Sequence, residues 1–311
     1  MDIIQEIKKL KKQKNAIILG HFYQLPEIQD ISDFIGDSLA LAQQAEKTEA
    51  DLIIFAGVSF MAETAKLINP TKKVILPDLN AGCSLADSCP AEDFKIFKVK
   101  YPDHLVVSYI NTTNAIKALS DIICTSSNAL AIINSFPKEQ KLIFAPDKNL
   151  GNYLNKMTGR NMVVWPGACH VHKRFSLERI LQIKEENKEA KIIAHPECEP
   201  EVLIVADFIG STTSLLNFTK NDNSNIFIVA TETGILHQMR KSNPGKTFIA
   251  APPDDATCAC NDCFFMKLIT LEKIYKSLVT ENPEITLDIE TADKALIPIR
   301  RMLDLSEKLG L

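Results

Sequence analysis

Eight cysteines stand in this chain of 311 residues, and cysteine is the side chain best suited to hold a soft metal ion or an iron–sulfur cluster. They occur at three distant places: around Cys83, around Cys169, and in a group that ends at Cys263. The sequence shows no secretory signal, so metal ligation or burial as free thiols is expected rather than disulfides. The full set is Cys83, Cys89, Cys124, Cys169, Cys198, Cys258, Cys260 and Cys263.

Local spacing leaves the choice among these cysteines open. Cys260 and Cys263 form a Cys-x-x-Cys pair, which is half of the ligand set of a structural zinc site, but no second close pair exists. Cys124 lies within an apolar run, which predicts a buried structural thiol. Cys198 directly follows a His-Pro-Glu motif and is either a thiol near a site or part of the core.

Acid–base chemistry is available from His195 and Glu197, which are two residues apart, and from Tyr23. No Gly-x-x-x-x-Gly-Lys-Ser/Thr loop and no Gly-x-Gly-x-x-Gly loop occurs, which disfavours a P-loop nucleotide hydrolase and a standard dinucleotide site. Ser and Asn residues after apolar runs have a plainer use as helix N-caps, and a helix N-terminus can also bind phosphate or carboxylate.

Short, nearly continuous apolar runs punctuate the chain, and such runs are typical of parallel strands covered by helices on both faces. Helical patterns, such as those at 37–45 and 60–67, lie between them, so the sequence predicts an α/β fold. The expected strands are 15–21, 51–57, 73–78, 105–111, 122–126, 142–147, 162–167, 191–197, 203–207, 226–231 and 247–252.

A cysteine follows the last strand of each of three groups, and the intervals indicate three similar units. We expect three-layer αβα units with small parallel sheets, at residues 1–84, 85–170 and 171–263, related by pseudo-threefold symmetry. The amphipathic helical tail, 264–311, is expected to pack back on the first unit. Because ligands bind beyond the carboxyl ends of parallel strands, the active site is expected at the central junction.

Composition places further limits on function. Hydrophobic residues make up 46% of the chain, charged residues 24%, and the net charge is −4, which gives no reason to expect nucleic acid as a partner. The N-terminal helical pattern has no continuous apolar segment, and apolar runs elsewhere are far shorter than a membrane span. A soluble cytoplasmic protein without a membrane partner is therefore expected.

Several motifs, in order from about residue 15 to residue 275, resemble the quinolinate synthase family. They are Gly20-His-Phe-Tyr-Gln24, Asp33-Phe-Ile-Gly-Asp-Ser-Leu39, Asn80-Ala-Gly-Cys83, Val107-Ser-Tyr-Ile-Asn-Thr112, Trp165-Pro-Gly-Ala-Cys169-His-Val-His172, His195-Pro-Glu-Cys198, Asp207-Phe-Ile-Gly-Ser-Thr212, Ala230-Thr-Glu-Thr-Gly-Ile-Leu-His237 and Cys263-Phe-Phe-Met-Lys-Leu268. This coverage is more specific than any single motif.

The resemblance implies a [4Fe–4S] cluster bound by Cys83, Cys169 and Cys263, with Cys258 and Cys260 as extra cysteines and Cys260–Cys263 as a redox-sensitive pair. It implies condensation of iminoaspartate with dihydroxyacetone phosphate to quinolinate, with loss of phosphate and two waters. An iminoaspartate-producing enzyme would be a transient partner. Tyr23, His195 and Glu197 are the implied catalytic residues. The implied substrate-binding residues are His21, Ser38, Tyr109, Asn111, Ser126, His172, Ser211 and Thr212.

Three thiolates for four irons leave one iron open to act as a Lewis acid in dehydration. Two other functions share this cofactor: another three-cysteine hydro-lyase, and a redox sensor without enzyme activity. The strand-end polar residues argue against the sensor, because a sensor needs no substrate pocket. A structural zinc protein is the remaining alternative.

Overall fold

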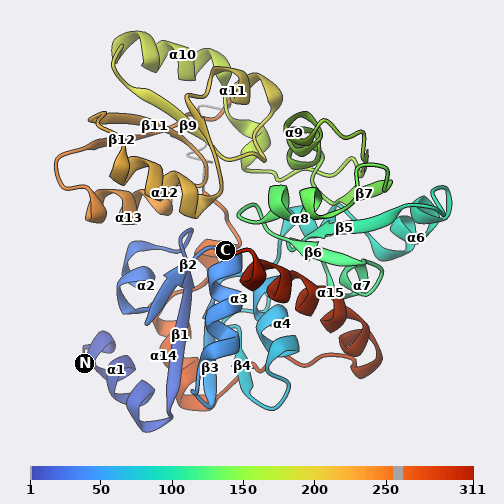
Figure 1. Ribbon diagram of the computed structural model, residues 1–311. Helices are drawn as coiled ribbons and strands as arrows, with labels where there is room; N and C mark the ends of the chain where they lie inside the picture. The colour runs from blue at the N-terminus through green and yellow to red at the C-terminus, as the bar shows by residue number, and fades with distance from the viewer. Residues whose placement is uncertain (1, 255–261) are drawn as a thin grey trace.

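The computed structural model describes residues 2–254 and 262–311, and Figure 1 shows three lobes around a common centre. Each lobe contains a four-stranded sheet in which every strand pairing is parallel. The α/β class with three small parallel sheets is therefore confirmed. The strands are β1 (Ala16–His21), β2 (Phe34–Gly36), β3 (Leu52–Ala56), β4 (Lys73–Ile75), β5 (Leu105–Tyr109), β6 (Ile122–Cys124), β7 (Leu142–Ala145), β8 (Val163–Val164), β9 (Lys191–Ala194), β10 (Phe208–Ile209), β11 (Ile226–Ala230) and β12 (Thr247–Ala250).

Helices connect the strands and cover the sheets. They are α1 (Ile3–Gln13), α2 (Pro26–Ile31), α3 (Ser38–Lys47), α4 (Ser59–Ile68), α5 (Ser84–Asp87), α6 (Ala91–Val99), α7 (Asn114–Lys117), α8 (Ala129–Ser135), α9 (Lys148–Thr158), α10 (Leu177–Glu186), α11 (Pro200–Val205), α12 (Thr212–Asn221), α13 (Ile235–Ser242), α14 (Leu271–Thr280) and α15 (Ile289–Lys308), with 3₁₀ turns at His172–Arg174 and Met266–Leu268.

The three sheets share one topology. Their strand orders are β2-β1-β3-β4, β6-β5-β7-β8 and β10-β9-β11-β12, so in each unit the first strand is central and the last lies at an edge. The strands that form the middle of the sheets are the apolar, β-branched runs, and β3 is buried along its whole length. Burial on both faces explains why these runs do not alternate with polar residues.

An aspartate performs the same task in every unit. Asp33, Asp121 and Asp207 each precede an edge strand, and each carboxylate accepts a hydrogen bond from a backbone N–H of the central strand, at 2.7 or 2.8 Å. The backbone N–H of the same aspartate donates back to that central-strand residue's carbonyl oxygen. The carboxylate thus adds a hydrogen bond to the backbone pairing of the two strands where the short edge strand begins. This contact is repeated in all three units.

One strand prediction was wrong, and one strand was not predicted. The run 203–207 is not a strand: its first part belongs to α11, which has Pro200 at its first turn, and the strand β10 begins only at Phe208. Proline fixes a helical φ at this position and lacks the N–H that a helix start leaves unused. The strand β2 was missed, because three residues are too few to show a hydrophobic pattern.

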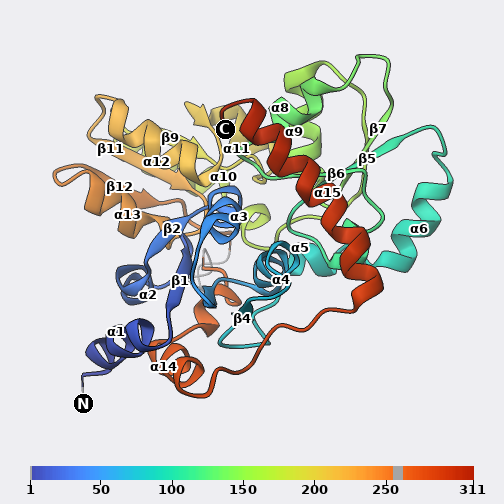
Figure 2. The ribbon, with the colours of Figure 1, turned by 60° about the horizontal axis from the view of Figure 1, so that its bottom comes forward.

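The helical tail was expected on the first unit, and its two helices have different neighbours. The helix α14 packs against α1 and β3, whereas α15 lies across α4 of the first lobe and α7 and β6 of the second. Figure 2 shows α15 crossing between the two lobes. The exact unit boundaries remain a prediction.

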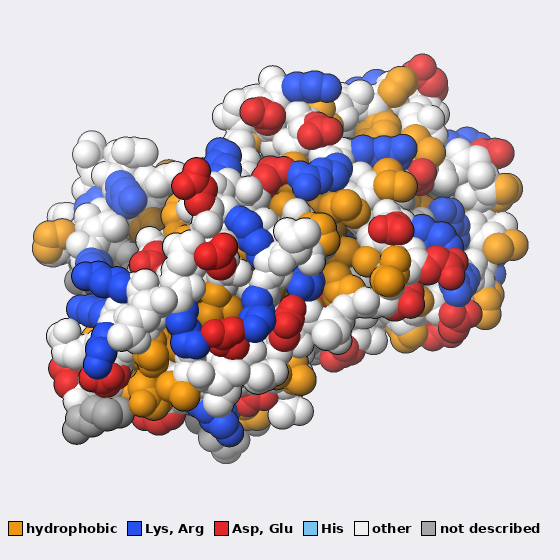
Figure 3. All heavy atoms as spheres, turned by 90° about the horizontal axis from the view of Figure 1, so that it is seen from below, with side chains coloured by type: hydrophobic (Ala, Val, Ile, Leu, Met, Phe, Trp, Pro, Cys, Tyr) orange, Lys and Arg blue, Asp and Glu red, His pale blue; other side chains and the backbone are white. Residues whose placement is uncertain are grey.

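Ion pairs attach the segment around α14 to the first lobe. Glu281 lies 2.6 Å from both Lys14 and Lys73, and Glu284 lies 3.0 Å from Lys66. The face seen in Figure 3 shows opposite charges interspersed rather than a field of one sign. Pairs as exposed as these contribute little stability individually. Within the part of the chain that the structure describes, none of the helices combines the length and apolarity needed to cross a membrane.

Candidate active site

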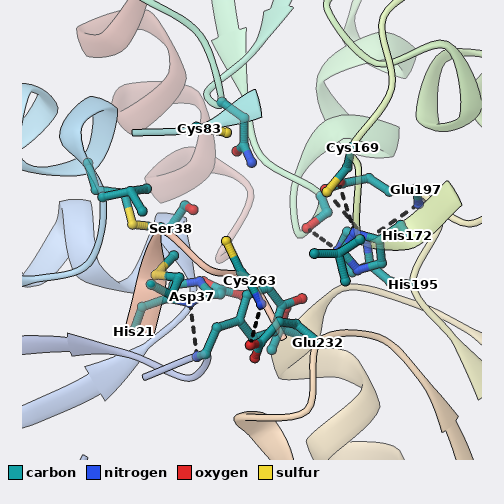
Figure 4. A pocket seen from close by; sticks show the side chains of 18 of the residues that line it. His21, Asp37, Ser38, Cys83, Cys169, His172, His195, Glu197, Glu232 and Cys263 are labelled. Atoms are coloured by element: carbon teal, nitrogen blue, oxygen red, sulfur yellow. Dashed lines mark hydrogen bonds and ion pairs between the residues drawn. The ribbon is translucent and has the colours of Figure 1, made fainter. Parts of the chain in front are cut away.

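A cavity lies where the carboxyl ends of the strands from the three sheets converge (Figure 4). All three predicted cysteines reach it, and so do the three predicted catalytic residues and most of the predicted substrate-binding residues. It is lined by His21, Tyr23, Asp37, Ser38, Val58, Phe60, Met61, Gly82, Cys83, Tyr109, Asn111, Thr125, Ser126, Cys169, Val171, His172, His195, Glu197, Thr212, Glu232, Cys263 and Met266.

The three cysteines come from equivalent places, since each follows the edge strand that ends its sheet: β4, β8 or β12. Burial raises the pKa of Cys83 to about 12 and that of Cys263 to about 11, and raises the pKa of Cys169 well above its usual value. These thiols are protonated in the metal-free chain at neutral pH, so metal binding must release protons. Cys258 and Cys260 lie outside the described residues.

A short helical turn begins just after each cysteine, and its backbone N–H groups oppose the effect of burial on the thiol pKa. The groups that lower the pKa are those of Ala86 and Leu85 for Cys83, in α5. The pKa of Cys169 is lowered by the N–H of His172, and that of Cys263 by those of Met266 and Phe265. Nearby N–H groups favour a thiolate, and hydrogen bonds to sulfur tune bound iron–sulfur clusters. By contrast, Cys89, Cys124 and Cys198 are fully buried and line no part of the cavity.

Glu197 is the centre of a buried polar network. Its Oε1 accepts a 2.7 Å hydrogen bond from the Tyr109 hydroxyl, and its Oε2 lies 3.2 Å from Nδ1 of His172, outside good hydrogen-bond geometry. Burial alone would raise the pKa of Glu197, but His172, with smaller effects of His195 and Tyr109, lowers it to about 2. Glu197 is therefore a carboxylate that can accept protons and hydrogen bonds inside a water-poor cavity.

His195 was predicted to pair with Glu197, but His195 Nδ1 lies 3.6 Å from Glu197 Oε1, too far for a hydrogen bond. Burial lowers the pKa of His195 to about 3 and that of His21 to about 4, so both imidazoles are neutral near pH 7. In each ring Nδ1 accepts a backbone N–H, from Glu197 and Tyr23 respectively. This assigns the proton to Nε2, which in His195 lies 3.2 Å from the Ser126 hydroxyl.

The Tyr23 hydroxyl connects the first unit to the third, through contacts of 3.0 Å to Thr212 and 2.7 Å to Thr231. His172 Nε2 also lies 3.0 Å from the Thr231 hydroxyl. Burial raises the pKa of Tyr23 well above its usual value, so the phenol is protonated near neutral pH and can donate a hydrogen bond. Ser211, another predicted substrate ligand, does not line the cavity: its side chain caps α12 by accepting from Ser214 N.

Two acidic residues of the cavity were not singled out from the sequence. Asp37 follows β2, and Glu232 follows β11, so the rule of polar residues at strand ends would have found both. Glu232 is almost fully buried, accepts from the backbone N–H of Cys263 at 2.9 Å, and pairs with Lys267 at 2.7 Å. It therefore holds the Cys263 loop against the third unit.

Asp37 joins all three units with one carboxylate oxygen. Its Oδ2 accepts hydrogen bonds from Ser127 of the second unit and Thr213 of the third, both at 2.6 Å, while Oδ1 caps α3. Hydrogen bonds to a charged acceptor are stronger than those between neutral groups. This residue therefore fixes the relative positions of the three strand ends that face the cavity.

We expect Asp37→Ala to lower the free energy of unfolding by about 3 kcal/mol, because it removes two charge-assisted hydrogen bonds and a helix cap. The matched control is Asp288→Ala, which removes only the exposed N-cap of α15 and should lower the stability much less. Anaerobic urea denaturation of both variants measures the difference. Equal losses would show that the junction contacts of Asp37 contribute nothing beyond the cap.

One group in the described chain is compact enough for a single metal ion: Cys169, His172 and Glu197, whose ligand atoms lie within 4.8 Å of one another. The three cysteine sulfurs do not form so tight a group. This is expected for a cluster, because each thiolate would bind a different iron atom. In this group Tyr109 holds Glu197 Oε1 and Thr231 holds His172 Nε2, whereas His172 Nδ1 lies 3.2 Å from Glu197 Oε2 without a hydrogen bond.

Comparison with known proteins decides the family. The family model described as quinolinate synthetase A protein matches residues 5–304. The chain belongs to the quinolinate synthase family. Quinolinate synthase of Microcystis aeruginosa is 58% identical over 305 residues, which cover 98% of this chain and 95% of that protein. That of Rippkaea orientalis is 60% identical, and the match covers 98% of this chain and 94% of that protein. That of Chloroherpeton thalassium is 55% identical, and the match covers 99% of this chain and 95% of that protein.

The quinolinate synthase family is the one that the sequence motifs predicted. Its enzymes act on small substrates, which agrees with the enclosed cavity. The chain spans nearly the full length of these relatives, so the match covers the three units and the tail alike. An enzyme of NAD biosynthesis is thus the identity that the family gives.

Proposed function

We propose that this chain condenses iminoaspartate with dihydroxyacetone phosphate to quinolinate, and that Cys83, Cys169 and Cys263 bind the [4Fe–4S] cluster that the reaction needs. The observation that carries the proposal is the convergence of three cysteines, one from each edge-strand loop, on one cavity with a buried acid–base network. The imine would come from an enzyme that oxidises an amino acid, with which a transient contact is part of the proposal.

The donor set fits a cluster. Each of the three cysteines lines the same cavity, and backbone N–H groups of the turn that follows it favour its thiolate. With three thiolates, one iron of a four-iron cluster would have no protein ligand and would supply Lewis-acid chemistry for removing hydroxyl groups. The mixed carboxylate, imidazole and thiol group at Cys169 lacks this symmetry.

The remaining residues fit two anionic substrates. Helices α3 and α12 begin at the cavity, at Ser38 and Thr212, and helix N-termini favour phosphate and carboxylate groups. The Oδ1 atom of Asn111 is buried without a hydrogen-bond partner, although Asn111 lines the cavity. A buried polar atom of this kind needs a partner, and a substrate hydroxyl or imine N–H would supply it.

Proton transfer falls to groups that surround the same space. Glu197 is the base we expect, since it is ionised, buried and held in place by Tyr109. Neutral His21 and His195 present Nε2–H donors that can hold a substrate oxygen. The Tyr23 phenol, held by Thr212 and Thr231, is the acid we expect for a leaving hydroxyl.

The test is anaerobic purification followed by an iron and sulfide count and a quinolinate assay with the two substrates. We expect about four irons and four sulfides per chain, a brown colour, and quinolinate as product. Zinc in a colourless protein would overturn the cluster. A loaded cluster that produces no quinolinate from these substrates would instead favour another hydro-lyase or a redox sensor.

A further inference from the structure

The residues that follow the three cysteines meet one another outside the lining of the cavity. Ser84 and His170 come directly after Cys83 and Cys169, and Phe265 is two residues after Cys263. None of the three lines the cavity, although their neighbours Cys83, Val171 and Met266 do. All three are half-buried, so this layer of Ser84, His170 and Phe265 is partly open to solvent beside the cysteine loops.

His170 is the member that contacts both others. Its Nδ1 lies 2.6 Å from the Ser84 hydroxyl, a short hydrogen bond between residues of different loops. Its ring packs edge-on against Phe265, with centroids 6.2 Å apart and planes at 87°. Phe265 also lies over Gly82, where an added Cβ would be 3.6 Å from the ring. The three loops are thus joined through one imidazole.

Further contacts hold the Cys83 and Cys169 loops together without involving His170. Trp165 Nε1 donates to the Ser88 carbonyl oxygen at 2.9 Å. Gly167 packs so closely on Ser88 that an added Cβ would lie 2.3 Å from the serine hydroxyl. The third loop is joined to His170's loop at its start, where Ser176 N–H donates to the Pro252 carbonyl oxygen at 3.0 Å and Asp254 N–H to the Arg174 carbonyl oxygen at 2.8 Å. Next to Cys263, the described contact between these two loops is the Phe265 ring against His170. Opening of the layer should therefore depend on His170.

We propose that His170, bonded to Ser84 and covered by Phe265, is a positioning residue that closes the outer side of the three-cysteine centre and slows the access of water and dioxygen to it. This rests on the proposed cluster. The imidazole excludes solvent by its bulk and by holding the Cys83 and Cys169 loops together. It needs no contact with substrate, so its effect should be on the lifetime of the bound cluster rather than on turnover.

The experiment compares variants that remove separate parts of the layer. Ser84→Ala and His170→Phe each remove the hydrogen bond and keep a side chain against Phe265, and His170→Ala removes both contacts. Phe264→Ala is the matched control, because Phe264 is 66% exposed and is adjacent to Phe265 in the same turn. All are loaded and assayed without oxygen, then transferred to air-saturated buffer while the cluster's visible absorbance is recorded.

We expect Ser84→Ala and His170→Phe to bleach about fivefold faster than the parent, the factor equivalent to about 1 kcal/mol for one hydrogen bond. His170→Ala should bleach faster still, and Phe264→Ala at the parent rate. Ser84→Ala and His170→Phe both remove the 2.6 Å bond, and Ser84→Ala also removes the longer 3.5 Å hydrogen bond from the His170 backbone N–H, so the double variant should match Ser84→Ala. Anaerobic kcat, KM and thermal midpoint should stay near the parent values.

The outcomes separate this inference from the proposed function. If the parent chain loads no cluster, the proposed cofactor is wrong and the shielding role is wrong with it. If clusters load and all variants bleach at the parent rate, only the role of His170 is wrong. Should His170→Ala fail to load, Ser84→Ala and His170→Phe decide the matter, because both keep the packing volume of the layer.

Discussion

Replacing Cys83, Cys169 or Cys263 by serine should remove most of the bound iron and lower quinolinate formation by more than about 100-fold. Even changes outside the first ligand shell of a metal typically cost about 10–100-fold in affinity or activity, so loss of a ligand should exceed that range. The three variants should be equally affected, since the three loops occupy equivalent positions in the three units. Iron and sulfide counts after anaerobic purification, with the assay, measure both effects.

The controls are thiols that the structure places in the core. Cys198 is fully buried and donates to the Ala230 carbonyl oxygen at 3.3 Å, and Cys89 is fully buried in the second unit. Cys198→Ala and Cys89→Ala should lower stability by about 1 kcal/mol and keep the iron. Full loading in Cys263→Ser, combined with loss in Cys260→Ser, would move the third ligand to Cys260.

Glu197→Gln should keep the cluster and lower kcat by about 10²–10⁴-fold, the range typical of a removed general acid or base. Glutamine has the same shape and still accepts a hydrogen bond from Tyr109, but it cannot take up a proton. The matched control is Glu199→Gln, two residues along the chain, where the carboxylate pairs with Lys148 and lines no part of the cavity. That variant should retain activity.

The iron content of the Glu197→Gln variant shows whether Glu197 acts as a base or as a metal ligand. Retained iron with lost turnover supports a base next to a three-cysteine centre. Loss of iron together with activity would instead favour the compact group of Cys169, His172 and Glu197 as a metal site. Tyr109→Phe adds a graded comparison, because it removes the 2.7 Å hydrogen bond to Glu197 while leaving the carboxylate ionised.

The sequence alone determined the elements that depend on local pattern. Apolar runs such as β3 and β11 are buried on both sides and show as continuous β-branched stretches, and the helices α3, α4 and α1 follow from their periodicity. The run 203–207 was mistaken because six residues with proline at the start can form a helix or a strand, and only packing chooses. The family motifs named the three cysteines that spacing left undecided.

Tertiary structure decided which of those residues meet. The pairing of Glu197 with Tyr109 and not His195 joins positions 88 residues apart, and the bond of Asp37 to Thr213 spans 176 residues. No local pattern encodes such contacts, because they depend on how three separate sheets orient their strand ends. The layer of Ser84, His170 and Phe265 arises in the same way. Each of the three lies within two residues of a cysteine in the sequence, but only the fold brings the three loops together.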